Sequence, residues 1–162
     1  MVKQKALSIV AFVGLTGSGK TTASAYLAQL GAPRITALDT TEIVDEITHI
    51  AEAGQRLIVI DDIASWEQYR AVKHAFPGRF TVVALTSQTN IRHRRLGKRQ
   101  SDALTIHQAE EQDREILAAS QKAEPIAAAD HTIINDGAIE DLHANIDEIV
   151  ATVRACTAGR WC

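Results

Sequence analysis

Eight residues near the amino end of the chain have the types and spacing needed to hold a nucleoside triphosphate. Gly14 is followed by four variable residues and then by Gly19, Lys20 and Thr21, which matches the pattern G-x-x-x-x-G-K-[ST] of a phosphate-binding loop. Glycines allow a backbone with positive φ, so that successive N–H groups can face phosphate oxygens. Lys20 can reach the β- and γ-phosphates, and the Thr21 hydroxyl can bind Mg²⁺. The residues predicted to contact the triphosphate are Gly14, Thr16, Gly17, Ser18, Gly19, Lys20, Thr21 and Thr22.

The segments on either side of this loop are a strand and a helix, as the pattern requires. Residues 7–13 form a continuous apolar run, typical of a strand that is buried on both faces, and residues 20–30 continue as a helix. Short apolar runs and amphipathic segments alternate along the rest of the chain. We expect further strands over residues 34–38, 57–60, 80–85 and 131–134, and helices over 40–53, 65–76, 89–96, 106–121 and 139–153. This alternation predicts an α/β three-layer sandwich with a five-stranded parallel sheet.

A parallel sheet of this kind brings the residues that follow its strands to one edge. Right-handed crossovers place the carboxyl ends of all the strands together, and ligands bind there. Gly14, Asp39, Asp61, Thr86 and Asn135 each come directly after a predicted strand. We therefore expect these five residues to share the edge that holds the triphosphate.

Two aspartates at that edge are candidates for metal binding and catalysis. Asp61 closes the third strand, where a carboxylate can hold a water bound to Mg²⁺ beside Thr21. Asp62 offers the same chemistry, and either residue could instead belong to a turn or cap a helix. Asp61 is preferred because it follows the apolar run directly. Asp39 could accept the proton of an acceptor hydroxyl, or cap the helix after it, or do both.

A strongly basic segment follows the fourth strand. Residues 92–99 read Arg-His-Arg-Arg-Leu-Gly-Lys-Arg, and on a helix Arg92, Arg95 and Arg99 fall on one face. Arginines that fold over a transferring phosphoryl group neutralise the charge that develops on it. A solvated charged face and a nucleic-acid patch are the alternatives, but no aromatic residues interleave with the charges to stack on bases. We predict a lid over residues 92–105, with these three arginines taking part in catalysis.

The composition excludes several other classes of protein. The chain has 162 residues and a formal net charge of −3, which gives no reason to expect nucleic acid or an anionic membrane as a partner. Its two cysteines, Cys156 and Cys162, lie close together in the chain and form no disulfide framework or metal motif. No guanine-reading Asn/Thr-Lys-x-Asp segment follows a strand, which favours adenine. We expect one cytoplasmic domain over residues 1–156, followed by a disordered tail over 157–162.

Four segments together resemble the small P-loop kinases of the adenylate kinase and dephospho-CoA kinase group, and most of all the uncharacterised dephospho-CoA-kinase-like proteins of archaea. They are residues 14–22 (GLTGSGKTT), the basic stretch 92–99 with Ser101-Asp102, residues 111–115 (EQDRE) and residues 129–137 (ADHTIINDG). The resemblance implies a P-loop nucleoside triphosphate hydrolase fold of the nucleotide kinase type. It also implies Mg²⁺-dependent transfer of a phosphoryl group from ATP to a nucleotide-like acceptor. Asn135 and Gly137 would then lie beside the adenine, and Asp39 would match the aspartate that follows the second strand.

The sequence departs from these kinases on the side of the acceptor. Only residues 40–56 are available between the second and third strands, where such kinases carry a larger acceptor-binding insertion. The segment 61–64 reads Asp-Asp-Ile-Ala and lacks the glycine and arginine of the usual Asp-Gly-x-Arg, and residues 40–55 contain no arginine. Three explanations stay open: an unusual acceptor, a site completed by a second subunit such as the other half of a homodimer, or a module that binds or hydrolyses ATP without a true acceptor. A polynucleotide kinase is disfavoured by the net acidity.

Overall fold

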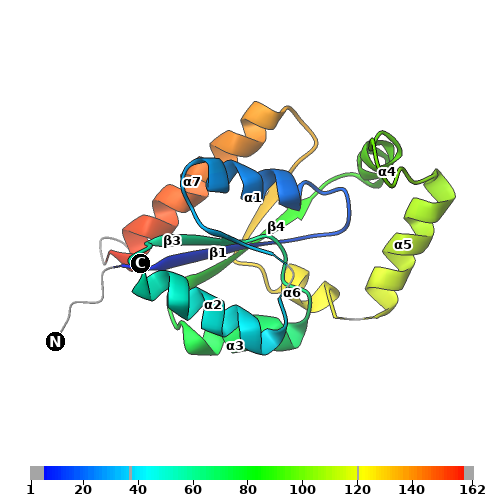
Figure 1. The fold of residues 1–162 in the computed structure, drawn as a ribbon. Helices are drawn as coiled ribbons and strands as arrows, with labels where there is room; N and C mark the ends of the chain where they lie inside the picture. The colour runs from blue at the N-terminus through cyan, green and yellow to red at the C-terminus, as the bar shows by residue number, and fades with distance from the viewer. Residues whose placement is uncertain (1–5, 37, 120, 159–162) are drawn as a thin grey trace.

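The computed structural model describes residues 6–36, 38–119 and 121–158, and in it a central sheet lies between two layers of helices (Figure 1). In chain order the elements are β1 (Ser8–Val13), α1 (Lys20–Gln29), β2 (Arg34–Ile35), α2 (Thr40–Glu52), β3 (Leu57–Ile60), α3 (Trp66–Ala75), β4 (Phe80–Thr86), α4 (Thr89–Gly97), α5 (Ile106–Ala118), α6 (Ala123–Ala127), β5 (His131–Ile134) and α7 (Ile139–Thr157). Within the described residues, none of the helices combines the length and the apolar character of a membrane span.

The five strands pair in the order β2-β3-β1-β4-β5, and every pair is parallel. The predicted α/β fold with a five-stranded parallel sheet is therefore confirmed. β1 lies between β3 and β4, so the chain leaves β1, builds one half of the sheet and then crosses to build the other. A binding crevice forms at such a switch point, beyond the carboxyl ends of the strands.

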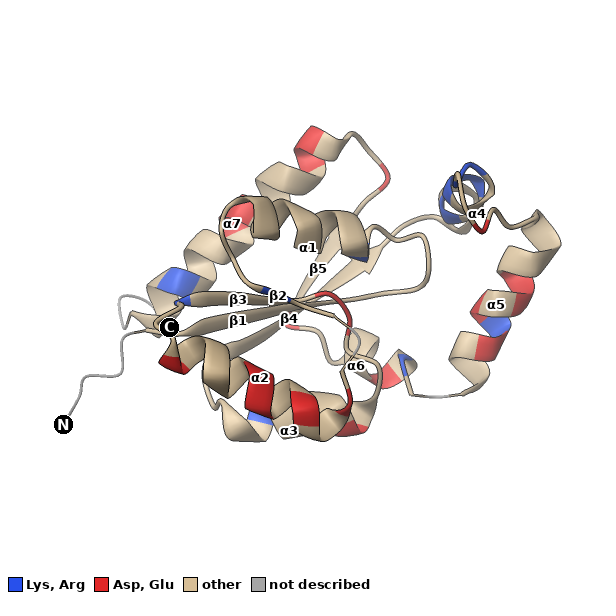
Figure 2. Ribbon diagram, viewed as in Figure 1, with Lys and Arg blue, Asp and Glu red and all other residues tan. Residues whose placement is uncertain are grey.

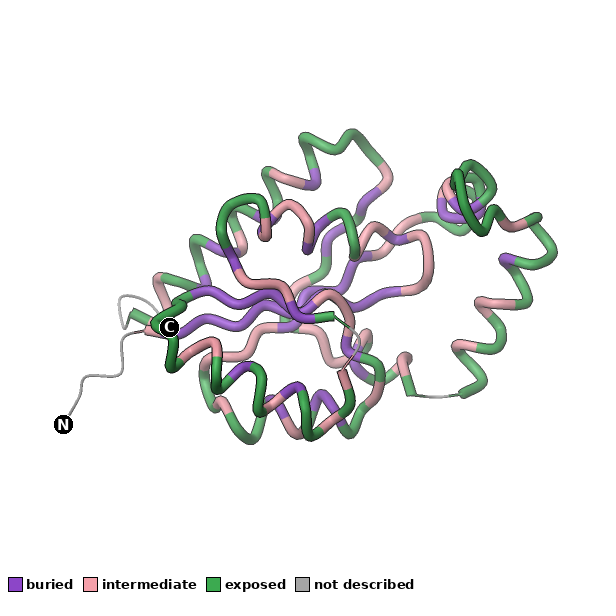
Figure 3. Tube along the Cα trace, in the orientation of Figure 1, coloured by how far each residue is buried: buried purple, intermediate pink, exposed green. Residues whose placement is uncertain are grey.

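The two faces of the sheet are covered by different helices. Side chains alternate between the faces along a strand, and along β1 Ile9 and Ala11 belong to the cluster packed under α2 and α3, whereas Val10 and Phe12 belong to the cluster under α1 and α7. β1 and β3 are buried along their whole length and β4 over most of its length (Figure 3), which explains why these strands are apolar runs. The sheet is thus a rigid platform for the loops at its carboxyl edge.

Helices α4 and α5 extend away from the sheet beyond that edge (Figure 1). We call these two helices and their connection, residues 89–118, the α4–α5 arm. The arm contains the basic segment, and Figure 2 shows Lys and Arg gathered on α4. Most of α5 is exposed, and Ala109 is its one buried residue. The segment expected to form a lid therefore lies on a projection of the chain.

Several predicted boundaries differ from the observed ones. β2 ends at Ile35 and not at residue 38, because it is an edge strand that pairs only with β3. Helix α6 was not predicted, since Pro125 reads as a break in the sequence; it lies in the first turn, where a missing N–H costs nothing. α7 continues through Cys156 to Thr157. Cys162 and the rest of the predicted tail from residue 159 onward lie outside the described residues.

Candidate active site

A cavity of about 500 Å³ lies at the carboxyl edge of the sheet, where the phosphate loop faces the α4–α5 arm. It brings together most of the residues that the sequence pointed to, from the loop, the end of β3 and the arm. Two further residues, Asp62 and Lys122, complete the lining. The lining residues are Thr16, Gly17, Gly19, Lys20, Thr21, Thr22, Asp61, Asp62, Arg95, Arg99 and Lys122.

The first turn of α1 is open to this cavity. Gly19 occupies the N-cap position and provides no side chain to cap the helix, and Gly19, Lys20, Thr21 and Thr22 all line the cavity. The N–H groups of a first helical turn have no partner within the helix and carry a partial positive charge. The amino end of α1 can therefore bind an anion such as phosphate.

Lys20 is the half-buried cation of the loop. Its Nζ donates to the carbonyl oxygen of Gly14 at 2.7 Å and lies 4.0 Å from Oδ2 of Asp62. Burial lowers the pKa of Lys20, while the neighbouring Asp62 opposes this shift. A phosphate group in the cavity would replace the Gly14 carbonyl as the partner of this ammonium group.

The two aspartates after β3 have separate partners. Oδ1 of Asp61 accepts a hydrogen bond from Ser24 Oγ at 2.7 Å, and Oδ2 accepts one from Arg34 at 2.6 Å. Oδ2 of Asp62 accepts one from Lys122 Nζ at 2.7 Å. Asp61 is thus tied to α1 and β2, whereas Asp62 lies between Lys20 and Lys122.

The three predicted arginines of the arm separate into two groups. Arg95 and Arg99 line the cavity, and Arg95 donates to the backbone oxygen of Asn135 at 2.8 Å. Arg92 does not line it. Its side chain is 5% exposed and forms an ion pair with Asp113 of α5. Arg92 and Arg95 share α4, but Arg99 lies beyond its last residue, Gly97, so the three arginines do not form one helix face. The spacing also did not predict that Arg92 turns inward.

A smaller cavity of about 190 Å³ adjoins the first on the side of β5. It is lined by Gly19, Thr22, Arg95, Asn135, Gly137, Ile139 and Leu142. Asn135 and Gly137, which the resemblance places beside the adenine, therefore lie next to the phosphate loop. Asn135 is buried and its Nδ2 donates to the backbone oxygen of Ser18 at 2.8 Å. Gly14 and Ser18 support the loop from behind and line neither cavity.

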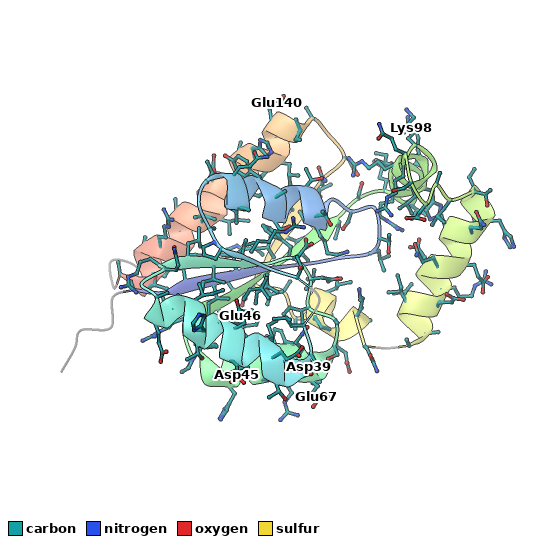
Figure 4. All side chains as sticks on the ribbon, in the orientation of Figure 1. Asp39, Asp45, Glu46, Glu67, Lys98 and Glu140 are labelled. Carbon is teal, nitrogen blue, oxygen red and sulfur yellow. The ribbon has the colours of Figure 1, made fainter. Side chains whose placement is uncertain are left out.

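Asp39 lies outside both linings. It is the N-cap of α2, where Oδ1 accepts hydrogen bonds from the backbone N–H groups of Thr41 and Glu42, both at 2.8 Å. Figure 4 shows it at the start of α2. The structure thus places Asp39 in the capping role that the sequence allowed, and its catalytic role stays a prediction.

Lys122 and Asp113 are the site residues that sequence reasoning missed. Both lie beyond the basic segment. Asp113 falls within residues 111–115, one of the segments that carry the resemblance, but no role for it followed from that; Lys122 lies in a stretch with no recognisable motif. The importance of Asp113 depends on how α5 packs on α4, and that of Lys122 on where the chain returns after the α4–α5 arm. No local pattern encodes either. The only signal for Lys122 in the sequence was its own positive charge close to Pro125.

Comparison with known protein sequences finds distant relatives in archaea. No protein-family model matches the chain. A UPF0200 protein of Sulfurisphaera tokodaii is 25% identical, and the match covers 91% of this chain and 98% of that protein. A UPF0200/UPF0201 protein of Archaeoglobus fulgidus is 26% identical; the match covers 89% of this chain but 55% of that protein. The first alignment spans 178 positions, more than the 162 residues of this chain, so that protein has residues with no counterpart here.

Several solved structures with the same fold are kinases of small molecules. A shikimate kinase from Bacteroides thetaiotaomicron has a TM-score of 0.58 at 13% identity, covering 90% of this chain and 98% of that one. A sugar kinase from Janibacter sp. HTCC2649 has a TM-score of 0.63 at 15% identity, covering 94% and 97%. A gluconokinase from Sinorhizobium meliloti has a TM-score of 0.57 at 15% identity, covering 91% and 95%. None of these three is a dephospho-CoA kinase, so that specificity stays a prediction. The three chains have the P-loop kinase fold, and this chain shares it.

Proposed function

We propose that this chain is a phosphotransferase that uses Mg²⁺-ATP to phosphorylate a small, nucleotide-like acceptor. The observation that carries the proposal is the composition of the larger cavity. It combines the phosphate loop with Lys20, two aspartates and the arginines of a projecting arm. A module that only binds a triphosphate needs the loop but not several cations around the γ-phosphate, whereas a phosphoryl-transfer reaction uses them.

The donor would occupy both cavities. The loop and the first turn of α1 would hold the phosphates, with Lys20 on the β- and γ-phosphates. The adenine would lie in the smaller cavity, against Asn135, Gly137 and Ile139. Because Gly19 and Thr22 line both cavities, one extended ligand can pass from one to the other.

The oxygen donors of the cavity fit Mg²⁺. The Thr21 hydroxyl and the Asp61 carboxylate line the same space, and hard cations prefer oxygen ligands. Mg²⁺ in phosphate-transferring enzymes keeps several waters and needs only one or two protein ligands. This agrees with the lack, in the described part of the chain, of a cluster of three or more metal-binding side chains. Bound Mg²⁺ would neutralise negative charge on the phosphates.

The acceptor would approach from the side of Asp62 and Lys122. The adenine cavity lies on the side of β5, so the opposite end of the larger cavity is where an acceptor can reach the γ-phosphate in line. α2 contributes no lysine or arginine there. Lys122, at the start of α6, supplies a positive charge instead. An acceptor that carries a phosphate would take the place of Asp62 as partner of Lys122.

The second candidate is a module that binds or hydrolyses ATP and regulates a partner. One observation favours it: among the described residues between β2 and β3, the thirteen-residue helix α2 is the one regular element. This leaves no separate element to enclose an acceptor. Water would then replace the acceptor hydroxyl, and the same cations would promote hydrolysis.

An acceptor screen with labelled ATP and Mg²⁺ separates the two functions. Nucleoside monophosphates, dephospho-CoA and nucleosides are each incubated with the protein, beside an ATPase assay. We expect transfer of label to at least one acceptor, faster than hydrolysis. Hydrolysis alone, with no labelled acceptor, would select the regulatory module.

Lys20→Ala tests the donor site in the same assays. We expect it to weaken binding of Mg²⁺-ATP by at least about tenfold, since an ammonium group hydrogen-bonded to phosphate contributes roughly 1.5–3 kcal/mol. Lys98→Ala is the matched control, because Lys98 is an exposed lysine of the arm that lines neither cavity. Calorimetry that gives the same affinity for the two variants would refute the assignment of the phosphate loop.

A further inference from the structure

We propose that Asp113 on α5 is a positioning residue, which couples the α4–α5 arm to the phosphate loop through the side chain of Arg92. The coupling rests on the proposed function in one respect, that the loop holds the phosphates of ATP. Asp113 itself lines neither cavity. Its effect on the nucleotide must therefore pass through Arg92.

The first link is a bidentate ion pair inside the arm. Two nitrogens of Arg92 donate to the two carboxylate oxygens of Asp113, at 2.9 and 2.7 Å. His93 Nε2 lies 2.9 Å from Oδ2 of the same carboxylate. Arg92 and His93 are both buried, at 4% and 6% exposure. One carboxylate of α5 thus holds two consecutive buried side chains of α4.

The second link joins Arg92 to the phosphate loop. Nη1 of Arg92, which already donates to Asp113, also donates to the backbone oxygen of Thr16 at 3.1 Å. The backbone of Gly17 packs on α4 as well: a Cβ at Gly17 would lie 3.1 Å from the backbone oxygen of Arg92 and 3.2 Å from the side chain of Leu96. Thr16 and Gly17 line the larger cavity. The tip of the loop is therefore docked on α4 at the point that Asp113 fixes.

The charge of Asp113 is what makes this connection firm. Burial alone would raise the pKa of Asp113, but the hydrogen bonds from Arg92 and His93 outweigh burial and hold its pKa below the usual range. The carboxylate is consequently ionised at neutral pH and neutralises the buried guanidinium. A buried arginine without a carboxylate partner leaves an uncompensated charge, which is strongly unfavourable. Without the Asp113 carboxylate, Arg92 would therefore turn toward solvent and release Thr16.

The rest of α5 gives this ion pair its importance. Apart from Ala109, the residues of α5 are exposed or half-buried, as Figure 3 shows. Few apolar contacts therefore hold α5 on α4, and the Asp113 pairs supply the polar attachment. Because binding couplings are reciprocal, a nucleotide that orders the loop also orders α5, and a well-placed α5 strengthens nucleotide binding.

Hydrogen exchange of the whole chain tests the coupling, with Mg²⁺-ATP as the probe. In the unmodified chain, Mg²⁺-ATP should slow exchange in α5 although α5 does not line either cavity. In Asp113→Asn the protection of α5 should disappear while protection of the loop is kept. The affinity for Mg²⁺-ATP should fall by about tenfold, within the roughly 5- to 150-fold range of coupled sites. Asp113→Glu should restore part of both effects.

Glu111→Gln is the matched control, because it removes a carboxylate from the same helix. Glu111 pairs with Arg114 in an exposed i,i+3 ion pair at 2.9 Å, which lies within α5. If Asp113→Asn does not fold, Arg92→Lys serves instead, since it keeps the charge but loses the bidentate geometry. The coupling would be overturned, without affecting the proposed function, by either of two results. One is that Mg²⁺-ATP does not slow hydrogen exchange in α5, and the other is that Asp113→Asn and Glu111→Gln have equal effects. Failure of the unmodified chain to bind Mg²⁺-ATP would overturn the proposed function with it.

Discussion

The side chain of Asn135 links the last strand of the sheet to the phosphate loop. It comes directly after β5, and its amide donates to the backbone oxygen of Ser18, 117 residues earlier in the chain. Gly19 lies immediately against this amide: its φ is +108°, and a Cβ there would be 2.4 Å from Nδ2 of Asn135. The glycine therefore meets two requirements, one of the backbone and one of space.

Gly19→Ala should damage nucleotide binding as well as stability. The left-handed backbone costs an L-residue roughly 1–2 kcal/mol, and the new methyl group also displaces Asn135 from Ser18. We expect affinity for ATP to fall at least about tenfold, or roughly 1.4 kcal/mol. Gly31→Ala is the control, because Gly31 has a φ of +93° and a Cβ there would meet nothing within 4 Å. Gly31→Ala should lose stability but bind ATP normally. Calorimetry measures the affinity for ATP and thermal unfolding measures the stability, so the two variants can be distinguished.

For single residues, the sequence predicted which chemistry a side chain offers better than it predicted which residues that side chain contacts. The loop could be read from spacing, because the conformation of Gly14 to Thr21 is local. The direction of Arg92 could not, because its partner Asp113 lies 21 residues further on, beyond the turn of the arm. The sequence favoured Asp61 over Asp62 only because Asp61 follows the strand directly. The contacts with Ser24, Arg34 and Lys122 show which side each one faces.

Among the elements, α2 is the one whose start bears on function. Asp39 and Glu42 form a capping box: the Asp39 carboxylate accepts from two backbone N–H groups, and Glu42 accepts from the N–H of Asp39 at 3.1 Å. Such caps satisfy backbone N–H groups of the first turn and so stabilise the start of the helix. Asp39 therefore has a structural reason to be an aspartate, whether or not it acts in catalysis.

Two substitutions at Asp39 separate capping from catalysis. Asp39→Ala should lower the free energy of unfolding by about 1 kcal/mol, within the range for lost N-caps. Asp39→Asn should be nearly as stable as the unmodified chain, because asparagine caps equally well, and chemical denaturation measures both. If Asp39 is the predicted proton acceptor, Asp39→Asn should slow phosphoryl transfer by roughly 10²–10⁴-fold with ATP affinity intact. Unchanged transfer in Asp39→Asn would assign Asp39 to the cap alone.

The elements of the sheet were largely predictable, and the exceptions have physical causes. β1, β3 and most of β4 are buried apolar runs, which are visible in any sequence, whereas β5 lies at the edge of the sheet and only its Ile133 is buried. β2 has two residues and a neighbour on one side only, so its limits depend on pairing and not on its own residues. Helix α6 is short and starts just after Lys122, and it is held by its surroundings more than by its sequence.

The whole molecule converges on one edge of the sheet. Residues from the β1–α1 loop, the end of β3, the α4–α5 arm and the start of α6 line one cavity, and β5 adds the second. These segments are far apart in the chain and are held together only in the folded state. A ligand that bridges them therefore binds the native state and not the unfolded chain, and must stabilise the fold.

Mg²⁺-ATP should accordingly raise the melting temperature of the whole protein. At about 100 times its Kd, a ligand specific for the native state adds about 2.7 kcal/mol, and a domain of this size gains roughly 2–4 °C per kcal/mol. We expect a rise of roughly 5–10 °C by scanning calorimetry. ATP with a chelator should raise it less, because Thr21 and Asp61 then have no metal to bind. Lys20→Ala should show little rise with either. Equal rises with Mg²⁺-ATP and with ATP plus chelator would show that magnesium does not contribute to binding. The phosphates alone would then account for all of the bridging between α1 and β3.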